Sequence, residues 1–110
     1  MDEVKERSSA FLQISFIDED ALPVIPTAAS YRIDDEESLT AIKALANITP
    51  LDTVVVILIT SEENRILNEN HGFEVRTVTV SYDYTSDMGA AHSNSYFKYK
   101  VKNLYGISAS

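Results

Sequence analysis

Two histidines are the residues of this chain best suited to acid–base chemistry. His71 and His92 are its only imidazoles, and the chain contains no cysteine. A hydroxyl nucleophile needs a base to take its proton and a third group to orient that base. Both histidines fall in predicted turns among Asn, Gly, Ala and Ser residues, outside any known nucleophile motif. We therefore expect exposed loop histidines and no enzymatic activity.

Two acidic runs, residues 18–20 and 34–37, offer carboxylate oxygens of the kind that Ca²⁺ prefers. Neither run has the spacing or the central glycine of an EF-hand loop, and short charge runs in turns are mostly solvated. Calcium binding at these turns stays open as the less favoured alternative. The three glycines are isolated and form no phosphate-binding loop, so the sequence predicts no metal and no cofactor.

Tyrosines and lysines concentrate in the last third of the chain. Five of the six tyrosines lie between residues 82 and 105, and tyrosine is enriched in protein interfaces because it buries a large area at low entropic cost. We expect Tyr82 and Tyr99 to face the core. Lysines at alternating positions form a basic stripe that either protects a sheet edge or attracts an acidic partner or a second copy. The candidate interface comprises Tyr84, Met88, His92, Tyr96, Lys98, Lys100, Lys102 and Tyr105.

A long hairpin must position these residues. Residues 74–84 alternate, with Arg76, Val78 and Val80 on the same face as two tyrosines, and residues 96–103 alternate aromatic and aliphatic side chains with lysines. The two segments predict antiparallel strands joined by a ten-residue loop, residues 85–94. We expect this loop to be a mobile contact segment.

The remaining segments also favour strands. Residues 10–17 alternate as a half-buried strand, residues 30–34 form a short one, and residues 53–60 are a β-branched run that predicts burial on both faces. Residues 38–48 fit either a strand or a helix, and we favour the strand. Residues 60–63 match a capping box, which predicts a short helical turn near residues 61–67.

Composition limits the fold to one domain. The 110 residues carry a net charge of −8, which disfavours binding to nucleic acid or to anionic lipid. No secretory signal is visible at the N-terminus, and the longest apolar run, Val54 to Ile59, is too short to span a membrane as a helix. We predict an all-β, immunoglobulin-like or fibronectin-like antiparallel sandwich of about seven strands at residues 10–107, with flexible segments at residues 1–9 and 108–110.

Four segments carry a resemblance to a known group of proteins. Residues 73–80 (FEVRTVTV), 96–107 (YFKYKVKNLYGI), 15–20 (SFIDED) and 26–34 (PTAASYRID) resemble small virion proteins of tailed bacteriophages and prophages. The resemblance implies an immunoglobulin-like fold in a non-enzymatic structural role at the neck, collar, head–tail interface or tail. It also implies synthesis in the bacterial host cytoplasm and assembly into a homo-oligomer that contacts portal, connector or tail components. The alternative is an adhesin-like module that recognises a host-surface protein or a carbohydrate.

Overall fold

The computed structural model describes residues 2–68 and 72–103 and contains seven β-strands. The all-β class and the strand number predicted from the sequence are confirmed. No helix in the described part of the chain has the length and apolar character needed to cross a membrane. The strands are β1 (Asp2–Lys5), β2 (Ala10–Ser15), β3 (Ala28–Asp35), β4 (Ala41–Asn47), β5 (Val54–Ile59), β6 (Phe73–Ser86) and β7 (Gly89–Lys102).

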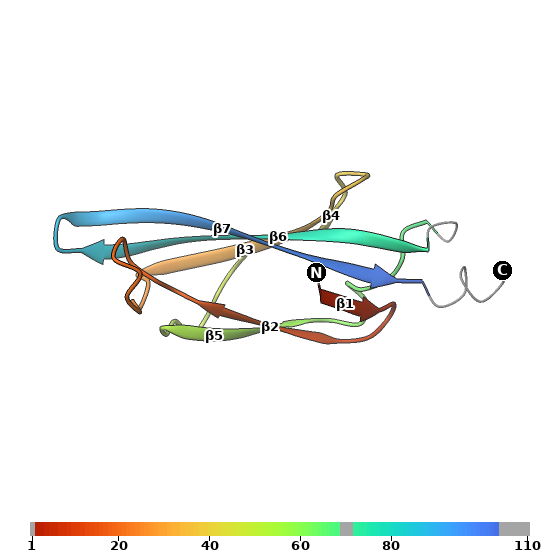
Figure 1. Cartoon of the computed structure of the whole chain (residues 1–110), viewed down its shortest axis with the longest axis horizontal. Coiled ribbons are helices and arrows are strands. Elements are labelled where there is room, and N and C mark those ends of the chain that lie inside the picture. Colours follow the sequence, from red (N-terminus) through yellow and green to blue (C-terminus); the bar gives the residue numbers. More distant parts are fainter. Residues whose placement is uncertain (1, 69–71, 104–110) are drawn as a thin grey trace.

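The strands form a large sheet and a small sheet that face each other (Figure 1). The large sheet has the order β1-β7-β6-β3-β4, and the small sheet pairs β2 with β5. Every pairing is antiparallel except β1 with β7, which is parallel. Alternate side chains of both sheets fill the space between them, and Phe16, Ile33, Val78, Val80 and Val101 are fully buried there. The molecule is elongated, with extents of 57 × 21 × 21 Å.

The β6–β7 hairpin is longer than the sequence suggested. The two strands pair without interruption from Phe73 opposite Lys102 to Ser86 opposite Gly89, so the turn consists of residues 87–88 only. The prediction of a ten-residue loop at residues 85–94 is wrong. Ser86 closes the turn, since its hydroxyl donates to the Gly89 carbonyl at 3.0 Å and accepts from the Met88 amide at 3.1 Å. Gly89 has φ 121°, which disfavours any residue with a Cβ.

The N-terminal segment supplies a strand that the sequence analysis did not anticipate. β1 pairs with residues 99–102 of β7, although we had expected flexibility throughout residues 1–9. Val4 packs against the core, and the Glu6 amide continues the pairing by donating to the Lys102 carbonyl at 2.9 Å. Such a short, polar segment shows no clear periodicity, because its position depends on the unpaired edge of β7.

Two further strand predictions have different outcomes. Residues 41–47 form the strand β4 and not a helix, with register shifts where the strand pairs with β3. The expectation that β5 is buried on both faces is wrong: Val55, Ile57 and Ile59 are buried, whereas the alternate side chains are exposed. Because β5 belongs to a two-stranded sheet that faces the core on one side only, its outer side chains remain at the surface.

The predicted capping box forms its hydrogen bonds, but no helix follows in the described residues. The Thr60 amide donates to Glu63 Oε1 at 2.8 Å, and the Glu63 amide donates to Thr60 Oγ1 at 3.2 Å. The chain then leaves the helical path after a single turn. The Arg76 guanidinium donates hydrogen bonds to the backbone carbonyl oxygens of Glu63 and Arg65 at 3.1 and 2.8 Å. Because these carbonyls bind Arg76, they do not continue the hydrogen-bond pattern of a helix.

Arg76 is the centre of a buried ionic cluster at the end of the large sheet. Its side chain is completely buried. Nε donates to Asp35 Oδ1 at 3.1 Å, and Nη2 donates to Glu74 Oε1 at 2.6 Å. Burial alone would raise the pKa of Asp35, but hydrogen bonds from Ser38 and Arg76 outweigh it and lower that pKa. The alternation of residues 74–84 predicted that Arg76 lies on the inward face of its strand, but it did not predict the ionic cluster.

The ionic cluster also fixes the connection that follows β5. Glu74 accepts hydrogen bonds from the amides of Leu67 and Asn68 at 2.8 and 3.0 Å. The Tyr99 hydroxyl donates to Asn64 Oδ1 at 3.0 Å, and burial raises the pKa of Tyr99 to about 12. These contacts attach the irregular segment to the large sheet, as expected for buried polar groups that must be satisfied inside the protein.

Candidate interaction surfaces

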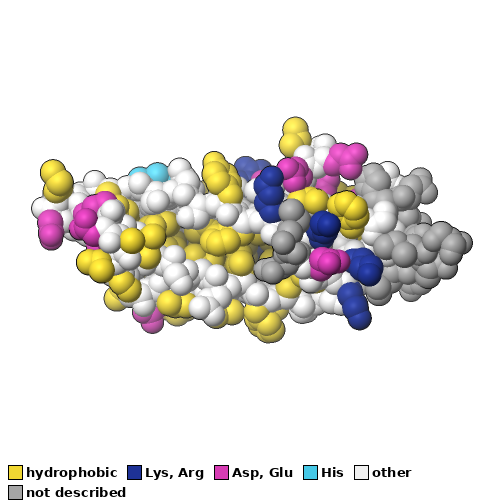
Figure 2. Space-filling model, viewed as in Figure 1, with side chains coloured by type: hydrophobic (Ala, Val, Ile, Leu, Met, Phe, Trp, Pro, Cys, Tyr) yellow, Lys and Arg dark blue, Asp and Glu magenta, His cyan; other side chains and the backbone are white. Residues whose placement is uncertain are grey.

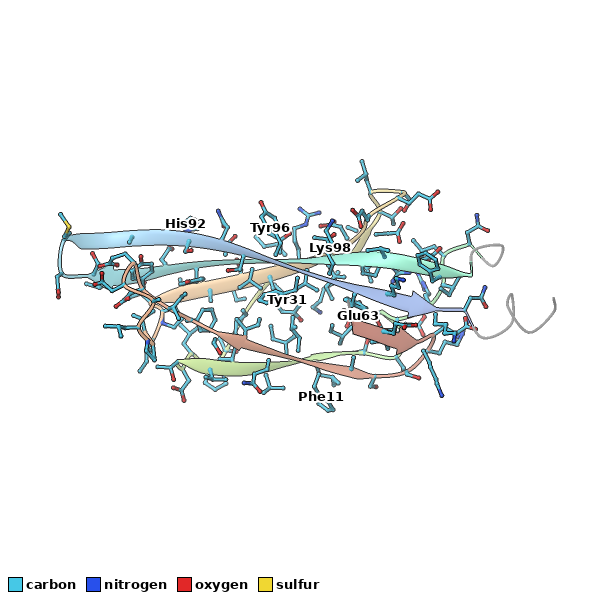
Figure 3. The ribbon with its side chains drawn as sticks, in the orientation of Figure 1. Phe11, Tyr31, Glu63, His92, Tyr96 and Lys98 are labelled. Atoms are coloured by element: carbon cyan, nitrogen blue, oxygen red, sulfur yellow. The ribbon has the colours of Figure 1, made fainter. Side chains whose placement is uncertain are left out.

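The eight candidate interface residues do not form one surface. Tyr84 faces the core with an exposed fraction of 7%, and its ring centroid lies 5.9 Å from that of Tyr82, so it presents no contact surface. Tyr105 lies outside the described residues. Met88 occupies the hairpin turn and is almost fully exposed. The other five lie on the outer face of β7, from which His92, Tyr96 and Lys98 project away from the small sheet (Figure 3).

The lysines of β7 make local contacts on that face. Lys98 Nζ lies 2.9 Å from Glu36 Oε1, and Lys100 Nζ lies 4.6 Å from the centroid of the Phe73 ring. Lys100 and Lys102 belong to the part of β7 that pairs with β1. They therefore cannot protect a free edge of the sheet, which was one of the two roles considered for the stripe.

His92 is exposed as predicted, but it lies in β7 and not in a loop, and His71 lies outside the described residues. His92 belongs to a small hydrogen-bond network at the surface. Its Nδ1 lies 2.6 Å from Asp83 Oδ1, and its Nε2 lies 3.2 Å from Asn94 Oδ1. The hydrogen bond with Asp83 is the main cause that raises the pKa of His92. Ser81 Oγ donates to the same Asn94 oxygen at 2.7 Å. Both ring nitrogens thus face hydrogen-bond acceptors, which suits the imidazolium form of His92. Neither nitrogen is placed to take a proton from the Ser81 hydroxyl.

The acidic runs do not converge on a metal site. Asp18 Oδ1 accepts from the amides of Asp20 and Leu22 at 2.9 and 3.0 Å, so this carboxylate closes its own turn. In residues 2–68 and 72–103, no group of three or more His, Cys, Asp or Glu side chains is arranged to hold a metal ion. The described part of the chain thus gives no support to the calcium alternative.

The outer face of the small sheet is apolar and carries no charged side chain. We call it the β2–β5 face. Phe11 and Val56 are 75% and 60% exposed, and Phe11 points away from both sheets (Figure 3). Hydrophobic side chains also line this lower side of the molecule in Figure 2. The face consists of Phe11, Gln13, Ser15, Val54, Val56 and Leu58. This face could not be recognised from the sequence, because the uniform apolar run in β5 predicted burial on both sides.

A second surface is the outer edge of β7 at residues 89–98, which we call the β7 edge. β1 pairs only with residues 99–102, and no other described strand occupies this side of β7. Directly beneath lies a groove of about 350 Å³ between β7 and β2, lined mainly by apolar side chains such as Leu12, Ile59 and Phe97. The sequence analysis missed this edge because it assigned most of these residues to a loop.

Comparison of the chain with protein-family models, with curated proteins and with solved structures found no match. Function must therefore be inferred from the sequence and from the surfaces described above. Both surfaces suit contacts with other proteins: exposed apolar patches mark interaction sites, and unpaired strand edges accept further strands.

Proposed function

We propose that this chain is a non-enzymatic structural protein of a tailed bacteriophage virion, present in multiple copies at the head–tail interface, neck, collar or tail. The phage setting is supported by the sequence resemblance carried by residues 15–20, 26–34, 73–80 and 96–107. The structural role is supported by the β2–β5 face and the β7 edge, which both offer area for contacts with other proteins.

We propose further that the fold is immunoglobulin-like. In such sandwiches, strands G, F and C form one sheet, and strands B and E lie next to each other in the facing sheet. The order β7-β6-β3 opposite the pair β2-β5 is consistent with this arrangement, and β4 would then correspond to the additional strand C′. Folds of this kind serve many unrelated binding roles, so the fold alone does not identify the partner.

The β2–β5 face is the observation that carries the structural role. Val54, Val56 and Leu58 are 44%, 60% and 48% exposed, and Phe11 lies opposite Leu58 in the pairing register. A two-stranded sheet is marginally stable by itself, and its outer face gains stability when another surface covers it. On a chain of net charge −8, an uncharged face also allows close approach with little electrostatic repulsion. We propose that another virion protein covers this face.

Incorporation into particles tests this function. Tailed particles purified from a lysate of cells carrying the gene should contain the protein in stoichiometric amounts, as measured by quantitative mass spectrometry. Leu58→Lys should strongly reduce incorporation, because it places a charge on the β2–β5 face. Leu45→Lys is the matched control, since Leu45 is 65% exposed on β4, away from this face.

Three results would contradict the proposal. The first is the absence of the protein from intact particles, and the second is equal incorporation of both lysine variants. The third is clear binding of this protein to a glycan array together with its absence from particles, which would favour the adhesin-like alternative.

A further inference from the structure

We propose that two copies of this chain pair through their β7 edges in antiparallel orientation, about a twofold axis at Ser93. The pairing would join two five-stranded sheets into one continuous sheet. It deepens the proposed function by naming a second copy as one partner of the assembly. It does not depend on the phage setting and can be tested with the isolated protein.

The backbone of the β7 edge is oriented for this pairing. The Lys102 carbonyl accepts from the Glu6 amide, so residue 102 directs its backbone groups away from β6. In antiparallel pairing the direction alternates with every residue, so the amides and carbonyls of Ala90, His92, Asn94 and Tyr96 also point outward. These groups lie on the side of β7 that no other described strand occupies.

The position of β1 limits where the second copy can lie. β1 begins opposite Tyr99 and occupies the same row that an added strand would occupy. With the twofold axis at Ser93, Gly89 of the second copy lies opposite Phe97, so its hairpin turn ends where β1 begins. The free row therefore accommodates the hairpin end of a second copy without displacing β1.

The side chains of the β7 edge do not oppose pairing. Natural edge strands are usually protected by lysine, proline or a bulge. Residues 89–98 contain no proline, and their pairing with β6 is regular throughout. Their one lysine, Lys98, lies at the end of the edge and pairs with Glu36 at 2.9 Å. Most of residues 89–98 are small or polar, and Phe97 lines the groove beneath the edge. An added strand would therefore also cover an apolar groove.

Charge complementarity favours the antiparallel orientation with a second copy. All nine Lys and Arg residues lie at the level of Thr79 or farther from the hairpin turn. Acidic residues such as Asp2, Glu3 and Glu36 lie at the same end, so that end carries charges of both signs. The hairpin end carries acidic residues, among them Asp83, Asp87 and residues 18–20, close to Ile17, whose carbonyl accepts from Tyr82. In Figure 2 basic and acidic side chains lie together in the right half, whereas the left tip shows acidic side chains and no basic ones.

An antiparallel pair brings an acidic hairpin turn close to a lysine at both ends of the contact. With the axis at Ser93, Met88 of the second copy lies opposite Lys98, and the neighbouring Asp87 comes close to that lysine. Complementary charges of this kind fix orientation and register more than they raise affinity. A parallel arrangement would instead place the two acidic ends side by side.

Sedimentation equilibrium of the isolated protein tests the pairing. The wild type should form dimers. Asn94→Pro should weaken dimerisation at least about 100-fold, because it removes an outward amide while leaving the β6–β7 hydrogen bonds in place. Asn94→Lys should have a similar effect, which covers the case in which the proline variant fails to fold. Ser81→Lys is the matched control on the same face, one strand away from the edge, and should dimerise like the wild type.

Disulfide trapping adds a positive test, because the chain contains no cysteine. A mixture of His92→Cys and Asn94→Cys chains should cross-link rapidly, because residues 92 and 94 of two copies face each other when the axis lies at Ser93, whereas a mixture of His92→Cys and Ser81→Cys chains should not. Asn94→Cys and Ser81→Cys both remove the Ser81–Asn94 hydrogen bond, so the comparison tests position relative to the edge. A monomeric wild type at millimolar concentration, or an Asn94→Lys variant that dimerises like the wild type, would overturn the pairing.

Two outcomes separate this proposal from the proposed function. If Leu58→Lys abolishes dimerisation and Asn94→Lys does not, the copies meet through the β2–β5 face, and only the β7-edge pairing is wrong. If the dimer forms through the β7 edge but particles lack the protein, the pairing stands and the virion function fails.

Discussion

The two ends of the large sheet are closed by different kinds of interaction. At the end near residue 76, the closing contacts are polar: a buried arginine meets two carboxylates and two backbone carbonyls. At the hairpin end they are aromatic, with Phe16 against Tyr82 at a centroid distance of 4.9 Å and a tilt of 70°. We call these the Arg76 end and the hairpin end. The Arg76 end must hold an irregular connection in place, whereas the hairpin end is already closed by its two-residue turn.

This difference shows how polar and apolar closure respond to change. Apolar contacts at the hairpin end are largely independent of pH, because loss of one leaves no buried charge behind. The members of the ionic cluster depend on one another, because removal of one leaves a buried charge without its ionic partner. The Arg76 end should therefore be the more sensitive of the two, and four measurements examine that expectation.

Removal of the arginine should have the largest effect. Arg76→Met leaves the Asp35 and Glu74 carboxylates buried without their shared partner and should lower the free energy of unfolding by about 3–5 kcal/mol, measured by urea denaturation. Arg32→Met is the control, because Arg32 is about half exposed and pairs with Asp34 at 2.8 Å. The control should lose less than about 1 kcal/mol. Equal losses would show that the cluster contributes no more than a surface ion pair.

Truncation of an aromatic ring should affect the hairpin end somewhat less. Phe16→Ala removes a fully buried ring and should lower the free energy of unfolding by about 3 kcal/mol. Phe11→Ala changes an exposed residue of β2, the strand that Phe16 directly follows, and should change the free energy of unfolding by about 0.5 kcal/mol or less. The loss in Phe16→Ala should be the same at pH 7 and pH 4. A strong pH dependence of that loss would contradict purely apolar closure.

Acid should weaken the Arg76 end in particular. The pKa of Asp35 is lowered in the folded protein, so Asp35 contributes its full stability above its usual pKa. That contribution is lost as the pH falls through the lowered, folded-state pKa. The difference in unfolding free energy between the wild type and Asp35→Asn should therefore shrink as the pH falls from 7 toward 2. A constant difference over this range would show that the charge of Asp35 does not stabilise the fold.

The smallest effect should come from the exposed histidine at the hairpin end. The hydrogen bond with Asp83 raises the pKa of His92 above its usual value of 6.5. The stability linked to this pair is present below that usual pKa and is lost as the pH rises through the folded-state pKa. In an NMR titration, Asp83→Asn should lower the pKa of His92 more than Asn94→Ala does. An unchanged pKa in Asp83→Asn would contradict the assigned cause.

Much of the β6–β7 hairpin could be predicted from the sequence. The alternation in residues 74–84 and 96–103 placed Val78, Val80, Tyr82 and Tyr99 inward, as observed. The continuation of the hairpin through residues 89–94 could not be predicted, since Gly, Ala, Ser and Asn carry little periodic signal. Their strand conformation comes from pairing with residues 81–86, which is information that lies in another part of the chain.

The candidate surfaces were harder to predict. Alternation placed Lys98 and Lys100 outward, and both are on the outer face. The β2–β5 face could not be found, because exposure of Val54, Val56 and Leu58 depends on how many layers and strands surround β5. A run of β-branched residues fits burial on one face or on both, and local sequence does not distinguish the two.

The sequence by itself determined the all-β class and the alternation of inward and outward side chains, because both follow from local propensity and from the two-residue period of a strand. Tertiary structure alone decided three features: the partner of β1, the burial of Arg76 among Asp35 and Glu74, and the part of β7 that stays open. Each of these features depends on contacts between residues far apart in the chain. Pairing and exclusion of water act through space, so they select among arrangements that the local pattern leaves equally acceptable.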